Sequence, residues 1–400
     1  MSAYAAFSSR NYRYLLAGVT LSNFGQQMLS VVVSWDLYLA TRSALVLGNV
    51  GLVQIIPVML FTFVAGHVAD RYSRRNTALL TQAAAAAIGF LLLFAGQYRG
   101  VATIYTALFL IATARGFQWP VTTAMLPATV PVEHLTNAVS WNGSAREMAT
   151  VAGPALAGGL IAWSGSEAVY LVQAVCGVAS VFCFRRMQLP PQPVEANPLP
   201  GWQATLEGLR FVWRDKVIFA AISLDLLAVL FGGAVALLPI FAEDILQVGA
   251  TGLGYLRAAP ALGAGLMSIY LAHASSSIRR AGLAMLLSVA AFGAATIGFA
   301  LATVAWVSFV MLFLIGAFDA VSVVFRLSLV QLRTPDPLRG RVAAVKSLFI
   351  ASSNQWGAVE SGVAAEIMGT VPSVVFGGGM TILIVMLVAW FARSLRQWRT

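Results

Sequence analysis

Long apolar runs, separated by short polar or Pro/Gly-rich breaks, cover most of the 400 residues. A transmembrane helix needs about 20 consecutive apolar residues, and most of these runs are at least that long. The pattern predicts an all-α membrane protein of about twelve transmembrane helices. The predicted spans are residues 14–40, 46–68, 76–97, 101–126, 136–163, 167–185, 217–241, 251–273, 280–301, 304–329, 341–366 and 372–393.

One long polar interval interrupts this pattern near the middle of the chain. It begins with the Pro-rich segment 189–201 and continues with residues 202–214, where apolar residues recur at helical spacing. We expect this second part to be an amphipathic helix on the cytoplasmic face. The chain is thereby divided into an N-terminal six-helix bundle (1–186), a cytoplasmic linker (187–216) and a C-terminal six-helix bundle (217–400).

The two predicted bundles resemble each other in sequence. Residues 51–57 are similar to residues 254–260, and residues 108–112 recur as 312–316, at a near-constant spacing of about 204 residues. Such a spacing over several spans indicates two pseudo-symmetric halves. Two halves of this kind are the organisation expected of a transporter whose site lies between them near the bilayer midplane.

The composition and the placement of charge agree with a membrane protein. Of the residues, 59% are hydrophobic and 10% are charged, whereas a soluble domain carries about 25% charged residues. Basic residues cluster at alternate span ends, and the opposite loops hold only Arg42 and Arg99. This asymmetry predicts cytoplasmic N and C termini. The net charge of +10 therefore reports topology, and we expect no nucleic-acid partner.

Ionisable side chains occur inside several predicted spans, although each costs roughly 2.5–3.5 kcal/mol there on insertion scales. Arg115 and Asp319 occupy equivalent positions in the two halves, so both are expected to face a shared cavity; the alternative is an ion pair that only locks helices together. Glu147 is expected opposite Arg115, whereas Arg326 and Lys346 can extend towards cytoplasmic water. A carboxylate whose surroundings change between conformations can load and release a proton. The predicted proton-coupling residues are Asp36, Arg115, Glu147, Asp225, Asp319 and Glu360.

Polar and aromatic residues also lie inside the spans. Each aromatic residue alone is explained as well by helix packing or by an aromatic belt at the membrane interface. Together they fit a bulky, partly aromatic or amphipathic ligand better than a sugar or a phosphate. The predicted substrate-cavity residues are Asn23, Gln27, Gln54, Gln118, Trp119, Trp141, Asn142, Arg146, Asn354 and Trp356.

The sequence does not indicate a metal site or an enzyme. Cys176 and Cys183 lie in one apolar span without nearby ligand partners, and the three histidines do not cluster. A membrane-embedded enzyme would need a nucleophile, a base or a metal cluster that converge, so it is the less favoured interpretation. We expect no metal and no cofactor, with a proton gradient as the energy source.

The loop after the second predicted span reads Gly66-His-Val-Ala-Asp70-Arg71-Tyr-Ser-Arg74-Arg75. It resembles the signature loop Gly-x-x-x-Asp-Arg-x-x-Arg-Arg of the major facilitator superfamily, and every fixed position is present. In that family the loop acts as a conformational latch. The resemblance therefore assigns a latch role to Gly66, Asp70, Arg71, Arg74 and Arg75.

Two weaker motifs agree with this resemblance. Arg115-Gly-Phe-Gln118 resembles the family's Arg-x-x-Gln-Gly element, associated with proton coupling, with Trp119 in place of the final Gly. Residues 153–159 resemble the Gly-Pro motif that is typical of antiporters, with Ala157 at a usual Gly. The antiporter-motif residues are Gly153, Pro154, Gly158 and Gly159.

Residues 207–214 and 352–362 resemble the branch that contains enterobactin-type siderophore exporters and macrolide-like drug exporters. The resemblance implies a multi-pass protein of the bacterial cytoplasmic (inner) membrane, whose partners are a small-molecule substrate, the lipid bilayer and protons; we expect a monomer. The predicted function is a secondary active transporter that exports small organic molecules, such as siderophores or drugs, by proton antiport and alternating access. A facilitated uptake carrier or a uniporter is the alternative, against which the Gly-Pro motif weighs.

Overall fold

The computed structural model describes residues 4–96, 99–189, 201–274, 280–335 and 338–398, and nearly all of them are helical. Their contacts group them into two compact units. One unit contains Met1–Ala40 and Val53–Gly201, and the other contains Thr41–Leu52 and Trp202–Thr400. The change of unit at residue 201 falls inside the interval predicted to be the linker.

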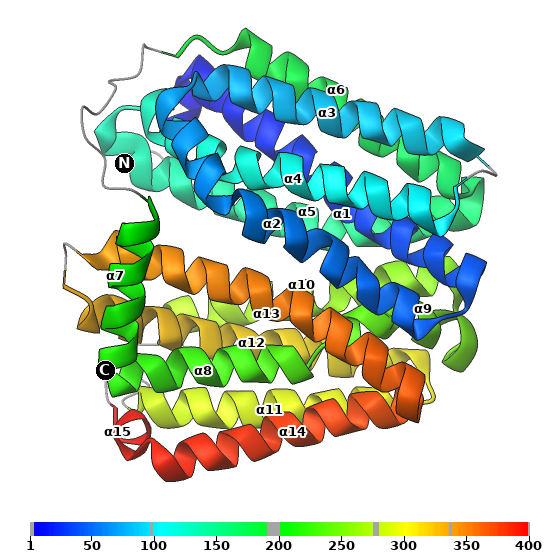
Figure 1. Ribbon diagram of the computed structural model, residues 1–400, viewed down its shortest axis with the longest axis vertical. Coiled ribbons are helices and arrows are strands. Elements are labelled where there is room, and N and C mark those ends of the chain that lie inside the picture. The colour runs from blue at the N-terminus through cyan, green and yellow to red at the C-terminus, as the bar shows by residue number, and fades with distance from the viewer. Residues whose placement is uncertain (1–3, 97–98, 190–200, 275–279, 336–337, 399–400) are drawn as a thin grey trace. The chain divides into compact units, whose positions relative to one another are not determined.

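The first unit is made of long helices joined by short loops. Helix α3 lies beside α4 and α6 (Figure 1), and a core cluster near one end includes the fully buried Tyr12, Leu15, Met125 and Phe184. The last residue of α1 and the first residues of α2 group with the other unit. The helices are α1 (Arg10–Thr41), α2 (Ala44–Arg71), α3 (Arg74–Ala95), α4 (Val101–Met125), α5 (Leu135–Ser164) and α6 (Ser166–Arg186).

The second unit packs its helices around a larger apolar cluster. Helix α8 contacts α13 and α14, and α11 contacts α12 and α14 (Figure 1); the buried Ile218, Met285, Leu329 and Val345 represent the core. The helices are α7 (Gly201–Arg214), α8 (Lys216–Phe231), α9 (Leu238–Ile240), α10 (Gly249–Ala274), α11 (Ala281–Leu301), α12 (Ala305–Arg333), α13 (Arg339–Met368), α14 (Thr370–Phe391) and α15 (Arg393–Arg396).

Eight helical segments of the described residues are long and apolar enough to cross a membrane. They include α3, α4, α6, α11, α12 and α14, the first part of α2, and the segment Lys216–Ile245. Helices α1, α5, α10 and α13 are also long, but glycines and polar residues interrupt their apolar runs. The exact number of spans and the cytoplasmic termini stay predictions.

The seventh predicted span is not one continuous α-helix. Helix α8 ends at Phe231, earlier than the predicted end at residue 241, and the chain continues through the 3-10 helix η5 (Ala234–Leu237), the short helix α9 and the π-helix η6 (Phe241–Ile245). Gly233 follows the end of α8, and a Cβ atom there would lie 2.6 Å from the backbone oxygen of Gly357. Two backbones approach closely at this point. The hydrophobic pattern of the sequence does not predict such a contact, so it does not predict the break in the helix.

Helix α7 confirms the helix predicted from residue 202 to residue 214. Its buried side carries Val212, which is 3% exposed, and Gly208, where a Cβ atom would lie 2.7 Å from the backbone oxygen of Arg341. Leu206 and Trp213, both on the predicted apolar face, are exposed to 42% and 70%. Leu209 and Phe211 pack against the apolar core of the second unit, so the protein covers part of the apolar surface of α7 and leaves the part with Leu206 and Trp213 exposed, as an amphipathic helix at a membrane surface would.

An acidic cap fixes the start of α8 against the end of α12. Asp215 accepts hydrogen bonds from the backbone N–H groups of Val217 (2.9 Å) and Ile218 (3.1 Å) and from Nε of Arg333 (3.0 Å). Burial raises the pKa of Asp215, but these hydrogen bonds and the charge of Arg333 outweigh burial and hold the pKa below its usual value. The cap positions α8 and α12 side by side, and these two helices carry the charged residues described below.

Helices α10 and α12 cross so closely that Gly263 has no room for a side chain. A Cβ atom on Gly263 would overlap the backbone oxygen of Phe313, whereas a Cβ atom on Gly265 would meet nothing within 4 Å. Gly263→Ala is expected to reduce the free energy of unfolding by about 1–3 kcal/mol, because overpacking forces the helices apart. Thermal unfolding in detergent measures the effect, with Gly265→Ala on the same helix as the matched control. Equal melting temperatures for the two variants would contradict the tight crossing.

Candidate functional site

The second unit contains three charged side chains on α8 and α12 that lie close together. Asp225 lies in α8, and Asp319 and Arg326 lie about two turns apart on one face of α12. The guanidinium of Arg326 forms an ion pair with the carboxylate of Asp225. The exposed fractions of Asp225 and Arg326 are only 8% and 3%, so this pair is inside the bundle.

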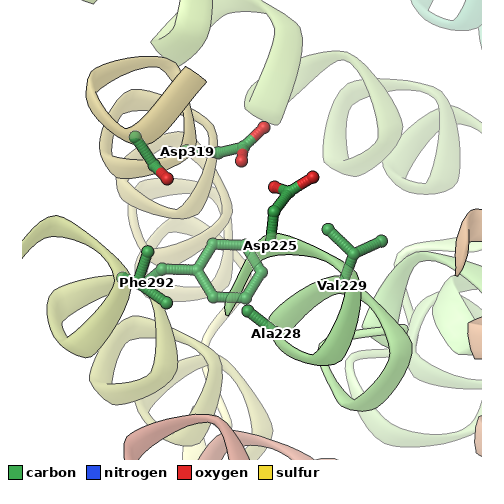
Figure 2. A pocket seen from close by; sticks show the side chains of 7 residues that line it. Asp225, Ala228, Val229, Phe292 and Asp319 are labelled. Atoms are coloured by element: carbon green, nitrogen blue, oxygen red, sulfur yellow. The ribbon is translucent and has the colours of Figure 1, made fainter. Parts of the chain in front are cut away.

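Asp319 lines a small cavity together with Asp225 and several apolar side chains. Figure 2 shows the carboxyl groups of Asp225 and Asp319 beside this cavity, which Phe292, Val229 and Ser322 also line. The space available to the centre of a water molecule is about 10 Å³, which is close to what one water needs. The cavity thus provides room for one water molecule next to two carboxyl groups.

The charges of this cluster do not balance around Asp319. Its charged neighbours are Asp225 and Arg326, and within the described residues Asp319 forms no ion pair. Two ionised carboxylates beside one guanidinium carry a net charge of −1, so one bound proton would make the set neutral. Lys346 on α13 lies near Asp225 and Arg326 but is not among the charged neighbours of Asp319, so its positive charge does not balance the carboxylate of Asp319. The arrangement has the chemistry needed to exchange one proton.

Arg326 lies elsewhere than the sequence suggested. Its position near the end of a predicted span indicated a head group that extends to cytoplasmic water, but the side chain is buried. The carboxylate of Asp225, on a neighbouring helix, holds the guanidinium inside. Nε of Arg326 has no hydrogen-bond partner among the described residues, so part of its donor capacity is unused.

The first unit contains a separate polar pocket between α1, α3, α4 and α6. The space available to the centre of a water molecule is about 20 Å³. Gln118 donates from Nε2 to the hydroxyl oxygen of Ser22 at 3.1 Å, and Arg115, though in the middle of α4, is exposed. The polar residues that line the pocket are Ser22, Gln26, Gln82, Arg115, Gln118 and Gln173.

The expected pairing of Arg115 with Glu147 is not formed. The ion pairs of the described residues do not include one between these two side chains. The charged neighbour of Arg115 is instead a second cation, Arg146. The guanidinium of Arg146 lies 5.2 Å from the ring centroid of Trp119, while Glu147, one residue further along α5, is exposed.

Asp36 belongs to a different polar network of the first unit. Its carboxylate accepts hydrogen bonds from the hydroxyl groups of Ser166 (2.5 Å) and Tyr170 (2.9 Å) on α6. The guanidinium of Arg99 lies 4.8 Å from the ring centroid of Tyr170 and forms an ion pair with Glu167. Because hydroxyl donors already hold the carboxylate, Asp36 has a helix-packing role whether or not it also binds protons.

Several predicted cavity residues of the first unit have structural partners. The ring of Trp141 stacks on Tyr4, with centroids 5.6 Å apart, and meets Phe7 edge-on at 5.2 Å, which places it in N-terminal packing. Gln27 donates from Nε2 to the hydroxyl of Thr150 at 3.0 Å and connects α1 with α5. Three further predicted cavity residues are half-buried: Asn23, Gln54 and Asn142. The side-chain oxygen of Asn142 has no hydrogen-bond partner among the described residues.

The predicted residues of α13 lie on the second unit. Trp356 is 46% exposed, and Asn354 donates from Nδ2 to the backbone oxygen of Ile350 at 3.0 Å. Glu360 is half-buried and accepts a hydrogen bond of 3.4 Å from the hydroxyl of Ser361. None of these three lines the cavity beside Asp319.

Two arginines of the predicted latch bind the ends of neighbouring helices. Arg74 donates from Nη1 to the backbone oxygen of Ala124 at 3.0 Å, and Arg75 donates from Nε to that of Phe184 at 3.2 Å. A cation at a helix C-terminus satisfies free carbonyl groups and opposes the helix dipole. Of the other loop residues, Arg71 is exposed, and the side chains of Gly66 and Asp70 lie outside the described part of the structure.

The Gly-Pro motif brings α5 close to α1. A Cβ atom on Gly153 would lie 2.7 Å from Cβ of Gln27, whereas a Cβ atom on Gly159 would meet nothing within 4 Å. Pro154 and Gly158 are buried. Small residues thus permit a close helix contact on one side of α5.

Sequence reasoning missed Gln82 and Gln173, although both line the pocket beside Arg115. Both are glutamines inside otherwise apolar runs. The same feature predicts Gln54 and Gln118 as cavity residues. No group of three or more potential metal ligands occurs within the described residues.

Comparison with known proteins identifies the class to which this fold belongs. The sequence model of the Major Facilitator Superfamily matches residues 15–358. The chain belongs to this superfamily, and it is therefore a multi-pass membrane transporter and not an enzyme.

Individual relatives make the comparison more specific. The chain is 27% identical over 380 residues to the enterobactin exporter EntS of Salmonella choleraesuis, covering 93% of this chain and 90% of the relative. It is 22% identical over 393 residues to the staphyloferrin A transporter of Staphylococcus aureus, covering 96% and 97%.

Solved structures show the same fold at lower identity. The POT family transporter PepTSo superposes with a TM-score of 0.76 at 15% identity, covering 97% of this chain and 98% of that chain. A bacterial homologue of the iron transporter ferroportin gives a TM-score of 0.72 at 17% identity, covering 97% and 99%. At these identities the likeness concerns the fold alone.

Proposed function

We propose that this chain is a secondary active transporter that exports small organic molecules, such as siderophores or drugs, in exchange for protons. The observation that carries the proposal is the set of Asp225, Asp319 and Arg326 around one cavity. A buried charge is expensive in a membrane span and is retained where it has a function. Here two carboxyl groups share one guanidinium, so a single proton decides whether the set is charged.

The proton would bias the conformational cycle of the transporter. With one proton bound, the set is neutral and is easily enclosed by apolar side chains; without it, the excess negative charge favours a conformation in which water reaches Asp319. A proton that crosses ~100 mV supplies about 2.3 kcal/mol. We infer that alternating access couples this energy to the movement of substrate in the opposite direction.

The Gly-Pro motif and the relatives support a direction and a cellular location for the proposed transport. The Gly-Pro motif in α5 is typical of antiporters, and the relatives include proteins named as enterobactin exporters. We therefore propose export across the bacterial cytoplasmic membrane, in agreement with the motif and with the relatives. The transporter would act as a monomer and would need no cofactor beyond the proton gradient.

Purified protein in proteoliposomes tests this function. With a pH gradient imposed across the membrane, a fluorescent dye or a labelled siderophore should accumulate on the side from which protons leave, and a protonophore should abolish the accumulation. One proton across ~100 mV supports a concentration ratio of up to about 50. Substrate that only equilibrates, with no response to the protonophore, would establish the uniporter alternative and overturn the proposal.

A further inference from the structure

Three arginines surround one tyrosine where α1 begins and α6 ends. Arg10 donates from Nη2 to the hydroxyl oxygen of Tyr14 at 3.4 Å, and Arg186 and Arg13 are the other charged neighbours of Tyr14. Among the described residues, none of these three arginines forms an ion pair. We call Arg10, Arg13, Tyr14 and Arg186 the basic cluster. Because like charges at short range repel one another, an anion bound among them would be favoured.

Packing between α1 and α6 holds the basic cluster together. The hydroxyl of Ser180 donates to the backbone oxygen of Gly18, and a Cβ atom on Gly18 would lie 2.7 Å from the ring of Phe184. Asn11 donates from Nδ2 to the backbone oxygen of Gln188 at 2.7 Å and accepts from its backbone N–H at 3.0 Å. Other residues thus fix the two helix ends, so the arginines of the cluster are available to a ligand.

The free carbonyl groups at the end of α6 are bound by a different arginine. Arg75 on α3 donates to the backbone oxygens of Phe184 (3.2 Å) and Arg185. The guanidinium of Arg186 instead lies over the ring of Phe182, 4.7 Å from its centroid. A guanidinium that stacks on a ring keeps its N–H groups free for a phosphate.

An apolar stripe runs along α6 away from the basic cluster. It consists of Leu171, Val175, Val178 and Phe182, which are between 45% and 53% exposed. Their spacing of three and four residues places them on one face of the helix, and Arg186 follows Phe182 by one turn. The stripe is about 16 Å long, which is about half the thickness of a hydrocarbon core of about 30 Å. It therefore matches the acyl layer of one leaflet.

The cations and the apolar stripe together fit an anionic phospholipid. The arginines suit its phosphate, and the O–H of Tyr14, which has no acceptor among the described residues, is a further donor to that group. The stripe suits an acyl chain. A free phosphate would leave the stripe uncovered, and a zwitterionic lipid would bring a second positive charge to the cluster.

We propose that the basic cluster and the apolar stripe of α6 form a binding site for one anionic phospholipid. Its phosphate lies among Arg10, Arg13 and Arg186, and one acyl chain lies along the stripe. The site belongs to the first unit, whereas the proposed proton site belongs to the second, and it does not depend on the proposed function. The bound lipid would connect α1 with α6 beside the start of the linker.

Native mass spectrometry of the full chain in detergent tests the site. Phosphatidylglycerol and phosphatidylcholine with identical acyl chains differ in headgroup charge, and the natural protein should bind phosphatidylglycerol at least about tenfold more tightly. Arg13→Gln with Arg186→Gln should remove this preference. Tyr14→Phe should weaken phosphatidylglycerol binding at least about threefold, since a hydrogen bond to a charged group is lost. If the double arginine variant does not fold, the tyrosine variant alone tests the cluster.

Two further measurements test the apolar part and the source of the phosphate. Phe182→Ser should weaken the binding of both lipids alike, because it removes apolar contact and no charge. Glycerol phosphate, which has no acyl chain, should not displace phosphatidylglycerol. Displacement at comparable concentration would show a site for free phosphate and overturn the proposal.

The matched control is Arg333→Gln with Arg341→Gln. It removes the same net charge, but these two arginines already pair with Asp215 and Glu207. The preference for phosphatidylglycerol should therefore stay unchanged. An equal loss in this control would show that the overall charge of the protein attracts the lipid, and equal binding of both lipids by the natural protein would show no selective site. Either result would overturn the proposal.

Discussion

Proteoliposomes that contain Asp319→Asn are expected to exchange substrate across the membrane without concentrating it when a pH gradient is imposed. Asparagine has nearly the shape of a protonated aspartic acid but cannot release a proton, so the cluster with Asp225 and Arg326 would stay neutral throughout the cycle. The concentration ratio should fall from a limit of about 50 to about 1, since the energy of one proton is no longer coupled. Counterflow of labelled substrate should persist.

The matched control for this variant is Asp244→Asn in the same unit. The carboxylate of Asp244 pairs with Arg42 at 2.9 Å, and its side chain is 45% exposed. An exposed ion pair contributes little to stability, so gradient-driven accumulation should be unchanged. If Asp319→Asn accumulates substrate as the natural protein does, the proton does not bind at this carboxyl group.

The second large effect is expected on stability. Arg326→Leu should lower the free energy of unfolding by about 3–5 kcal/mol, because it leaves the buried carboxylate of Asp225 without its counter-charge. The double variant Asp225→Leu with Arg326→Leu should regain most of this loss, since two apolar side chains replace the pair together. Thermal unfolding in detergent at constant pH measures all three proteins.

Arg333→Leu on the same helix is the control for removal of an arginine. Arg333 pairs with Asp215 at 3.0 Å, and its side chain is 42% exposed, so its loss should cost at most about 1 kcal/mol. A double variant that is no more stable than Arg326→Leu would show that packing of the arginine stem, and not charge balance, determines the effect.

The sequence determined the helical membrane class and singled out charged residues for a candidate site. The length and spacing of the apolar runs depend on the thickness of the bilayer, which every span must match, so helices could be assigned without contacts. The signature loop and the match between the halves identified the superfamily, which the family comparison confirms. Charges in apolar runs, among them Asp225 and Asp319, stood out because lipid makes them costly.

The tertiary structure decided which of those charges meet. Helical spacing places residues on a face, but it does not say which neighbouring helix that face contacts. Hence Arg326, expected near water, is buried against Asp225, while Arg115 and Glu147, expected together, do not pair. Gln82 and Gln173 became site candidates only when α3 and α6 were seen to enclose one pocket with α4. Contacts between helices depend on side-chain shape and small-residue crossings, which the one-dimensional pattern of apolar and polar residues does not encode.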